Sequence, residues 1–142
     1  MKILFVCEGN VNRSQMAATI YVHRIPRVEV SSAGTMVPVE REGQTIATVS
    51  RQAIEAMKEI GYDMSANVMH QLTPEMVEAA GKIILVGPTP GGPLPDFLAH
   101  SEKLEKWDVP DPGYGHIGHR EARDMIMERI ERLTRSIDTG HL

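Results

Sequence analysis

Cysteine, aromatic residues and long apolar segments are all scarce in this chain. A single Cys among 142 residues excludes an internal disulfide and any metal site built from several thiolates. A lone thiol that stays reduced suits the cytoplasm. The N-terminal apolar run extends only from Ile3 to Val6, which is too short for the hydrophobic region of a signal peptide or for a membrane span. We therefore expect a cytoplasmic protein without a membrane partner.

An excess of positive charge is also absent. The net charge is −4 and the pI is near 5.8, so the surface as a whole does not attract nucleic acid or an anionic membrane. With 142 residues, 42% of them hydrophobic, the chain can bury one ordinary core. We expect a single domain over residues 1–142, present as a monomer or weak dimer, with no nucleic-acid partner.

Apolar runs alternate with segments of helical periodicity along the chain. Buried strands are predicted at residues 2–7 and 83–86, and shorter strands at 28–31 and 103–107. Residues 32–35 are expected to form a turn. Helices are predicted at residues 14–24, 50–61, 74–80, 96–100 and 117–137. This alternation predicts an α/β fold, a four-stranded parallel sheet with helices on both faces, which binds ligands beyond the carboxyl ends of its strands.

The first of these strands ends at the only cysteine, Cys7. A short loop with Gly9 then leads to Arg13 and Ser14 at the start of a helix. Loop amides, the helix dipole and the Arg13 guanidinium would converge on one spot and hold an oxyanion there. The same positive field favours the thiolate form of Cys7, the nucleophilic form. The loop therefore predicts a phosphate site in which phosphorus faces the sulfur for in-line attack. The alternative is a small buried side chain with a basic residue nearby by chance.

Phosphoryl transfer to sulfur also needs a proton for the departing oxygen. The Pro-rich segment 107–115 follows the last predicted strand and offers two carboxyl groups, Asp108 and Asp111. An Asp before Pro often does no more than cap a turn. The residues alone leave both carboxyl groups as candidates for the general acid.

Four stretches, in this order, resemble the low-molecular-weight protein tyrosine phosphatases: residues 6–14, 31–35, 71–75 and 108–112. The resemblance implies a parallel sheet in the order 2-1-3-4, a phosphocysteine intermediate, and neither metal nor other cofactor. It assigns Cys7 as nucleophile, Arg13 as phosphate ligand, and Asp111 as acid and then base. It places residues around the phosphate (Glu8, Gly9, Asn10, Val11, Asn12, Arg13 and Ser14) and in a network that braces the loop (Asn10, Ser14 and Ser32). The substrate it implies is a phosphorylated protein or a small aryl phosphate.

The chain also departs from the pattern of that family. Most members have a second Cys where this chain has Asn12, so we expect oxidation of Cys7 to run on to irreversible acids. Asn67 stands where the family often has His, so we expect the network that braces the loop to be built differently. Tyr114 is the main aromatic candidate for the substrate rim. Val11 resembles tyrosine-directed members more than the arginine-phosphate branch, and Glu8 adds negative charge at the mouth.

Two other functions are compatible with the same loop. A thioredoxin-coupled arsenate reductase shares the loop and fold, but with Cys7 alone it would need an external thiol. A phosphate-binding module without turnover would need Arg13 and the amides, but neither Cys7 nor Asp111. His116 and His119 are candidates for a pair of metal ligands. Two imidazoles without carboxylate or thiolate partners make a weak metal site, so we expect ordinary surface histidines.

Overall fold

The fold is built on four parallel strands, of which the two central ones are continuous apolar runs in the sequence. The computed structural model describes residues 2–25, 27–115 and 117–138. The strands are β1 (Lys2–Cys7), β2 (Glu29–Gly34), β3 (Lys82–Gly87) and β4 (Leu104–Asp108). They lie in the order β2-β1-β3-β4 and every neighbouring pair is parallel. The predicted sheet and its strand order are therefore confirmed.

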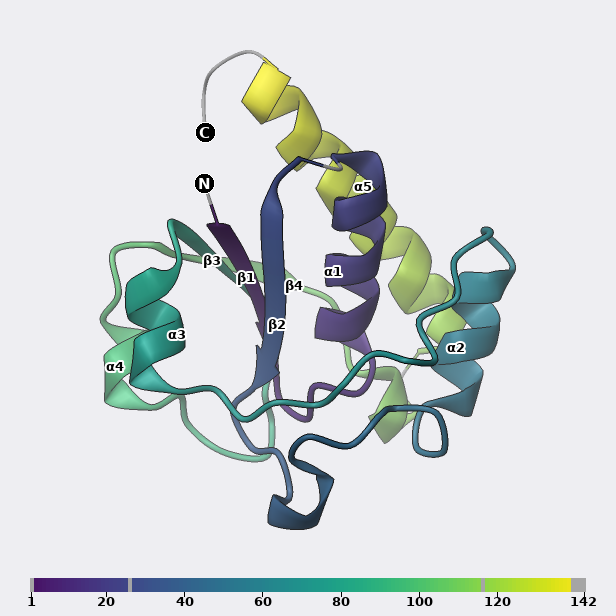
Figure 1. The fold of residues 1–142 in the computed structure, drawn as a ribbon, viewed down its shortest axis with the longest axis horizontal. Coiled ribbons are helices and arrows are strands. Elements are labelled where there is room, and N and C mark those ends of the chain that lie inside the picture. Colours follow the sequence, from purple (N-terminus) through teal and green to yellow (C-terminus); the bar gives the residue numbers. More distant parts are fainter. Residues whose placement is uncertain (1, 26, 116, 139–142) are drawn as a thin grey trace.

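Helices cover both faces of this sheet (Figure 1). They are α1 (Arg13–Arg24), α2 (Arg51–Lys58), α3 (Pro74–Ala79), α4 (Asp96–Ala99) and α5 (His119–Asp138), with short 3-10 turns at Val39–Arg41 and Pro112–Tyr114. Helices α1, α2 and α5 lie on one side, and α3 and α4 lie on the other. Within the described residues, none of the helices combines the length and apolar character needed to cross a membrane.

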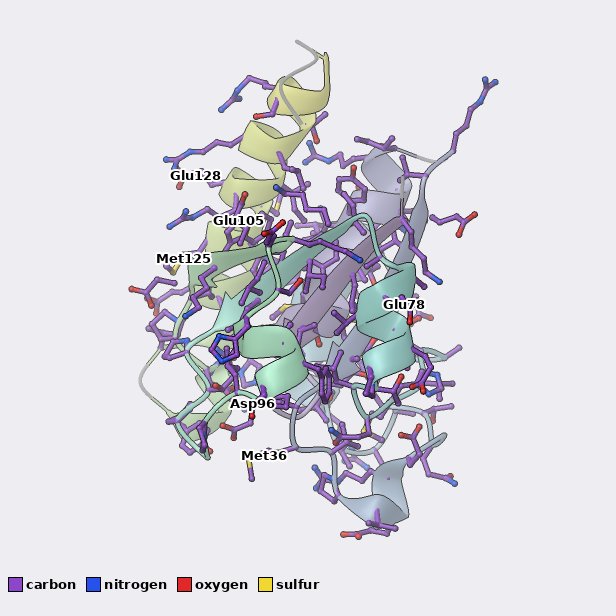
Figure 2. The ribbon with its side chains drawn as sticks, turned by 90° about the vertical axis from the view of Figure 1, so that its left-hand side faces the viewer. Met36, Glu78, Asp96, Glu105, Met125 and Glu128 are labelled. Carbon is purple, nitrogen blue, oxygen red and sulfur yellow. The ribbon has the colours of Figure 1, made fainter. Side chains whose placement is uncertain are left out.

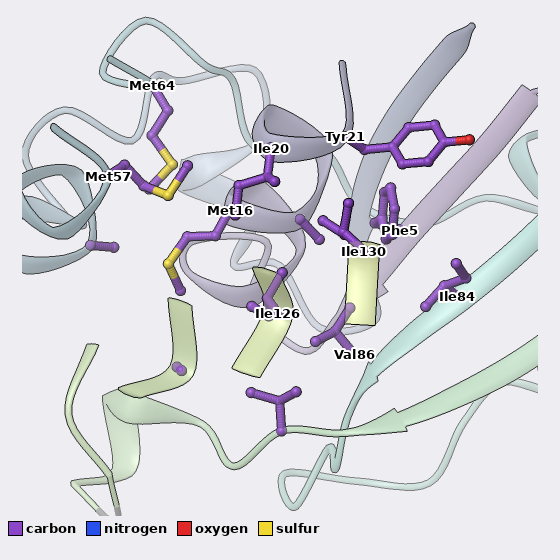
Figure 3. Close-up of a cluster of buried hydrophobic side chains, with 14 of the residues drawn as sticks. Phe5, Met16, Ile20, Tyr21, Met57, Met64, Ile84, Val86, Ile126 and Ile130 are labelled. Carbon is purple, nitrogen blue, oxygen red and sulfur yellow. The ribbon is translucent and has the colours of Figure 1, made fainter. Parts of the chain in front are cut away.

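Alternate residues of β1 supply the two halves of the core. Phe5 enters the larger half, where its ring meets Tyr21 of α1 edge-on at 5.8 Å between centroids and Trp107 of β4 at the same distance. Figure 3 shows Phe5 and Tyr21 beside Ile130 of α5. Leu4 and Val6 face the other way, toward α3 and α4. Because the central strand is buried on both faces, its carboxyl end is held rigidly at Cys7.

One predicted boundary was wrong, since residues 32–34 continue β2 instead of forming a turn. Cys7 of β1 pairs with Gly34 of β2, and a Cβ on Gly34 would lie 2.7 Å from the carbonyl oxygen of Glu8. The strand thus runs on to the point where it supports the loop after β1. Glycine is required there because the loop backbone occupies the space of a side chain.

Candidate active site

Cys7 lies at the end of β1 with its sulfur beside Ser14, the second residue of α1. The Sγ–Oγ distance is 3.0 Å, and Cys7 is 2% exposed. Ser14 Oγ accepts a hydrogen bond from Asn10 Nδ2 at 2.7 Å. The hydroxyl hydrogen of Ser14 is therefore left to point at the sulfur, where it stabilises a thiolate.

Asn10 holds the loop between Cys7 and α1 in its curved form. Its φ of 55° lies in the left-handed region, which Asn tolerates better than most residues. Besides Ser14, its amide nitrogen reaches Ser32 Oγ at 3.0 Å. Its amide oxygen accepts from the backbone N–H of His70 and from Gln15 Nε2. Of the three side chains predicted to form a bracing network, Asn10 thus donates to both Ser14 and Ser32.

Gln15 and Asn67 extend this network, and the role of Gln15 was not foreseen from the sequence. Gln15 is buried and donates to the carbonyl oxygens of Asn10 and Val68. Asn67 donates to Gln15 Oε1 at 3.2 Å and to Thr19 Oγ1 at 3.0 Å. A polar residue on the buried side of α1, one position after Ser14, was the available signal for Gln15. Asn67 stands where the resembled family often has His, which led us to expect a differently built bracing network.

Arg13 is the largest charged group in the site and is almost completely buried, at 1% exposed. Its Nη1 donates to the carbonyl oxygens of Pro88 and Val109, at 2.7 and 2.9 Å. Its Nη2 lies 3.3 Å from Asp111 Oδ2. The Nε–H has no hydrogen-bond partner within the described residues. A buried, oriented guanidinium donor without an acceptor is suited to bind an anion.

The loop backbone adds further donors beside Arg13. The N–H groups of residues 9–12 have no acceptor within the described chain. The first-turn amides of α1 have no intrahelical partner either. Amides and a guanidinium around one thiol form a cradle for a tetrahedral anion. The loop residues predicted to surround the phosphate are therefore gathered at one place, although Asn12 turns its side chain toward Gly113.

Asp111 is the carboxyl group that reaches this cradle. It sits at the start of the short turn Pro112–Tyr114, where its Oδ1 accepts from the N–H of Gly113 at 2.8 Å. Its other oxygen faces Arg13. The other candidate, Asp108, is exposed at the end of β4 and has no described hydrogen bond to the cradle residues. The structure thus brings Asp111, and not Asp108, to Arg13.

Glu8 and Tyr114 meet at the mouth of the cradle. Glu8 Oε2 accepts from the Tyr114 hydroxyl at 2.7 Å, and Oε1 accepts from the N–H of Gly91. The hydrogen bond and negative charge of Glu8 raise the pKa of Tyr114 above its ordinary value of 10.0. Met36 is half exposed at the same end of the molecule and extends into solvent in Figure 2. The rim is therefore acidic and aliphatic, with one aromatic ring.

His119 is the first residue of α5 and lies near the acid loop, which we define as residues 109–115 with Asp111. Partial burial lowers the pKa of His119 below its ordinary value of 6.5, and the nearby negative charge of Asp111 opposes this shift. His116, its partner in the candidate metal pair, lies outside the described residues. Within residues 2–25, 27–115 and 117–138, no group of three His, Cys, Asp or Glu side chains is placed to hold a metal ion.

Comparisons with known proteins match almost the entire chain. Residues 2–141 match the family model described as low molecular weight phosphotyrosine protein phosphatase. The protein-arginine-phosphatase of Geobacillus stearothermophilus is 30% identical, over 97% of this chain and 97% of its own length. The solved YwlE arginine phosphatase from that organism superposes with a TM-score of 0.76 and 29% identity, covering 98% of this chain and 94% of its own.

Two further relatives carry different names. The probable low molecular weight protein-tyrosine-phosphatase EpsP of Ralstonia solanacearum is 31% identical over 78% of this chain and 77% of its own. An arsenate reductase of Bacillus licheniformis is 29% identical over 97% of this chain and 96% of its own.

Proposed function

Because the chain belongs to the low molecular weight phosphotyrosine protein phosphatase family, we propose that it hydrolyses phosphotyrosine on proteins through a phosphocysteine intermediate on Cys7. The observation that carries this proposal is the buried Arg13 Nε, which lacks an acceptor beside a thiol and a carboxyl group. Two oxygens of a phosphate would take Nε and Nη2 in the bidentate manner that guanidinium favours. A cytoplasmic location, which keeps Cys7 reduced, is part of this proposal.

The first chemical step transfers the phosphoryl group to sulfur. The Cys7 thiolate attacks phosphorus, the S–P bond forms, and the P–O bond to the tyrosyl oxygen breaks. Asp111 donates its proton to that departing oxygen, because a phenoxide leaves poorly without one. The loop amides and Arg13 stabilise the charge on the equatorial oxygens, and Ser14 donates to the sulfur.

The second step releases phosphate and restores the enzyme. Water attacks the phosphorus of phosphocysteine and gives a proton to Asp111, which is now a carboxylate. The S–P bond breaks and its electron pair returns to sulfur as the thiolate, which the Ser14 hydroxyl stabilises. The bonds of Arg13 to Pro88 and Val109 support this role, because they fix the guanidinium while the substrate comes and goes.

Rapid-quench kinetics with p-nitrophenyl phosphate test the proposal. We expect a burst of p-nitrophenol close to one equivalent of enzyme, and its complete loss in Cys7→Ser. Arg13→Lys is expected to lower kcat/KM by about 100-fold or more, because an ammonium cannot make the bidentate contact. Arg24→Lys, at the other end of the same helix, is the matched control and should retain activity. Turnover that persists in Cys7→Ser would refute the mechanism.

Arsenate reduction is the second candidate, favoured by the arsenate reductase among the relatives. The reduction of arsenate to arsenite needs two electrons, which two thiols supply by forming a disulfide. With one Cys in the chain, the second thiol must come from outside. Arsenate-dependent consumption of an added thiol, absent without enzyme, would favour this activity over the phosphatase.

A further inference from the structure

A second cavity, of about 350 Å³, opens beside the phosphate cradle. Two of its lining residues adjoin the cradle in the chain, since Asn12 precedes Arg13 and Pro112 follows Asp111. The remaining wall comes from residues 48–52, which lead into α2 and form its first two positions, and from Gly113 and His119. None of the lining residues is acidic, and the Glu8 carboxylate, which is bonded to Tyr114, is not part of the lining.

The start of α2 presents free backbone donors to this cavity. Ser50 occupies the N-cap position, but its hydroxyl donates to the carbonyl oxygen of Val11 at 2.6 Å and makes no capping bond. The first-turn amides of the helix, beginning with Arg51, therefore keep their partial positive charge. The first turn contains no acidic residue, and the Arg51 side chain is exposed.

Asn12 supplies a second and independent observation. Its side chain is nearly buried, at 8% exposed, and has no hydrogen-bond partner within the described residues. Its Nδ2 lies 3.4 Å from the position that a Cβ on Gly113 would occupy, and both residues line the cavity. The fully buried and unpaired side-chain atoms of the described residues are Arg13 Nε and the Tyr21 hydroxyl. The Asn12 amide therefore reaches open space, where it is free to donate to a ligand in the cavity.

We propose that this cavity is a subsite for a carboxylate of the substrate, carried by an acidic residue close in sequence to the phosphorylated one. Asn12 Nδ2, the first-turn amides of α2 and the Arg51 guanidinium donate to it. The phosphate and the carboxylate are bound side by side. Asn12 and Pro112 of the subsite directly adjoin, in the sequence, Arg13 and Asp111 of the cradle. The inference rests on the proposed function and adds to it the sequence context of the substrate.

Paired phosphotyrosine peptides test this subsite. Each pair differs only by Glu or Gln at one position, scanned from three residues before to three after the phosphotyrosine. We expect kcat/KM to favour Glu over Gln by about tenfold at one or two positions at low salt, through KM, and the preference to shrink as salt is added. Arg51→Gln should reduce this ratio to about two- to threefold, and Asn12→Ser should also reduce it.

Lys58→Gln provides the matched control, since it removes a positive charge from the opposite end of the same helix. Its Glu/Gln ratio should equal that of the wild type. A wild-type ratio near one at every position, or an equal fall in Arg51→Gln and Lys58→Gln, would overturn the subsite. If acetate added to a Gln peptide raises the rate as much as the Glu peptide does, the site takes a free anion and the assignment to the substrate is overturned.

The two proposals fail in distinguishable ways. Hydrolysis of p-nitrophenyl phosphate that depends on Cys7, together with a flat peptide ratio, overturns the subsite alone. If no turnover is observed, calorimetric titration of Cys7→Ser with the same peptides still decides the point, because it measures binding without chemistry. The subsite is supported if Cys7→Ser binds the Glu peptide more tightly than the Gln peptide. The double variant Cys7→Ser, Arg51→Gln should then lose this difference.

Discussion

Tyr114 donates its hydroxyl to the Glu8 carboxylate at 2.7 Å and so links the acid loop to the loop that surrounds the phosphate. The second carboxylate oxygen of Glu8 accepts from Gly91, in the Pro- and Gly-rich loop after β3. One carboxylate therefore joins three loops at the mouth of the site. The link lies near the cradle, because the charges of Asp111 and Arg13 act on the pKa of Tyr114. Asp111 and Tyr114 also belong to the same loop.

Glu8→Gln should lower the pKa of Tyr114. In the wild type, the hydrogen bond to Glu8, and to a smaller extent the charge of Glu8, stabilise the neutral phenol, so the pKa of Tyr114 lies above its ordinary value of 10.0. A neutral Gln still accepts a hydrogen bond but does not repel a tyrosinate. NMR titration of ¹³Cζ-labelled tyrosine follows each of the three tyrosines separately. An unchanged Tyr114 midpoint in Glu8→Gln would contradict the link.

Asp111→Asn should lower kcat/KM most for substrates with poor leaving groups. Protonation matters little for p-nitrophenolate and greatly for a more basic phenolate, so we expect a loss in kcat/KM of about tenfold with p-nitrophenyl phosphate and about 100-fold or more with phenyl phosphate. Asp108→Asn is the control, because that carboxyl group is exposed at the end of β4. The same loss with both substrates would remove Asp111 from the role of acid.

Asn10→Ala should destabilise the fold by about 2–4 kcal/mol, because it removes a buried network and leaves Ala in the left-handed region. Asn10→Gly loses the same side-chain bonds but tolerates this backbone conformation. It should therefore be more stable than Asn10→Ala by about 1 kcal/mol. Urea unfolding measures both variants. Equal stability of the two would show that the backbone conformation contributes nothing.

The strands and the position of the nucleophile could be predicted because they depend on local patterns. The continuous apolar run ending at Cys7 indicates a strand buried on both faces whatever surrounds it. The end of β2 was missed because Ser32 and Gly34 are strand-forming only through their pairing with β1. The Glu8–Tyr114 bond and the approach of Asn67 to α1 join distant positions, which no local periodicity encodes.

Peroxide should inactivate the protein irreversibly. Cys7 is the only thiol in the chain, and Asn12 cannot trap its sulfenic acid as a disulfide, so oxidation proceeds to sulfinic and sulfonic acids. Asn12→Cys should regain most of its activity on thiol treatment. Intact mass before and after reduction measures the outcome. Full recovery of the wild type, without sulfinic acid at Cys7, would show the prediction wrong.

Stability should fall as the pH drops below about 6.5, in part because of His119. Burial lowers the pKa of this residue in the folded state. The unfolded chain therefore binds the proton first, which favours unfolding as pH falls through that window. His119→Gln should show a shallower decline. The test is the free energy of unfolding in urea between about pH 5 and pH 7.5. Identical slopes for both proteins would exclude the contribution of His119.

The missing side chain at Gly91 has a further consequence. A Cβ at this position would lie 2.7 Å from Glu8 Oε1, so even the change Gly91→Ala would push the carboxylate aside, away from Tyr114. The two positions are 83 residues apart in the chain, yet a side chain at 91 fits only if the flexible end of Glu8 moves. In sequences that descend from this one, we expect a larger residue at position 91 to occur together with a shorter residue at position 8.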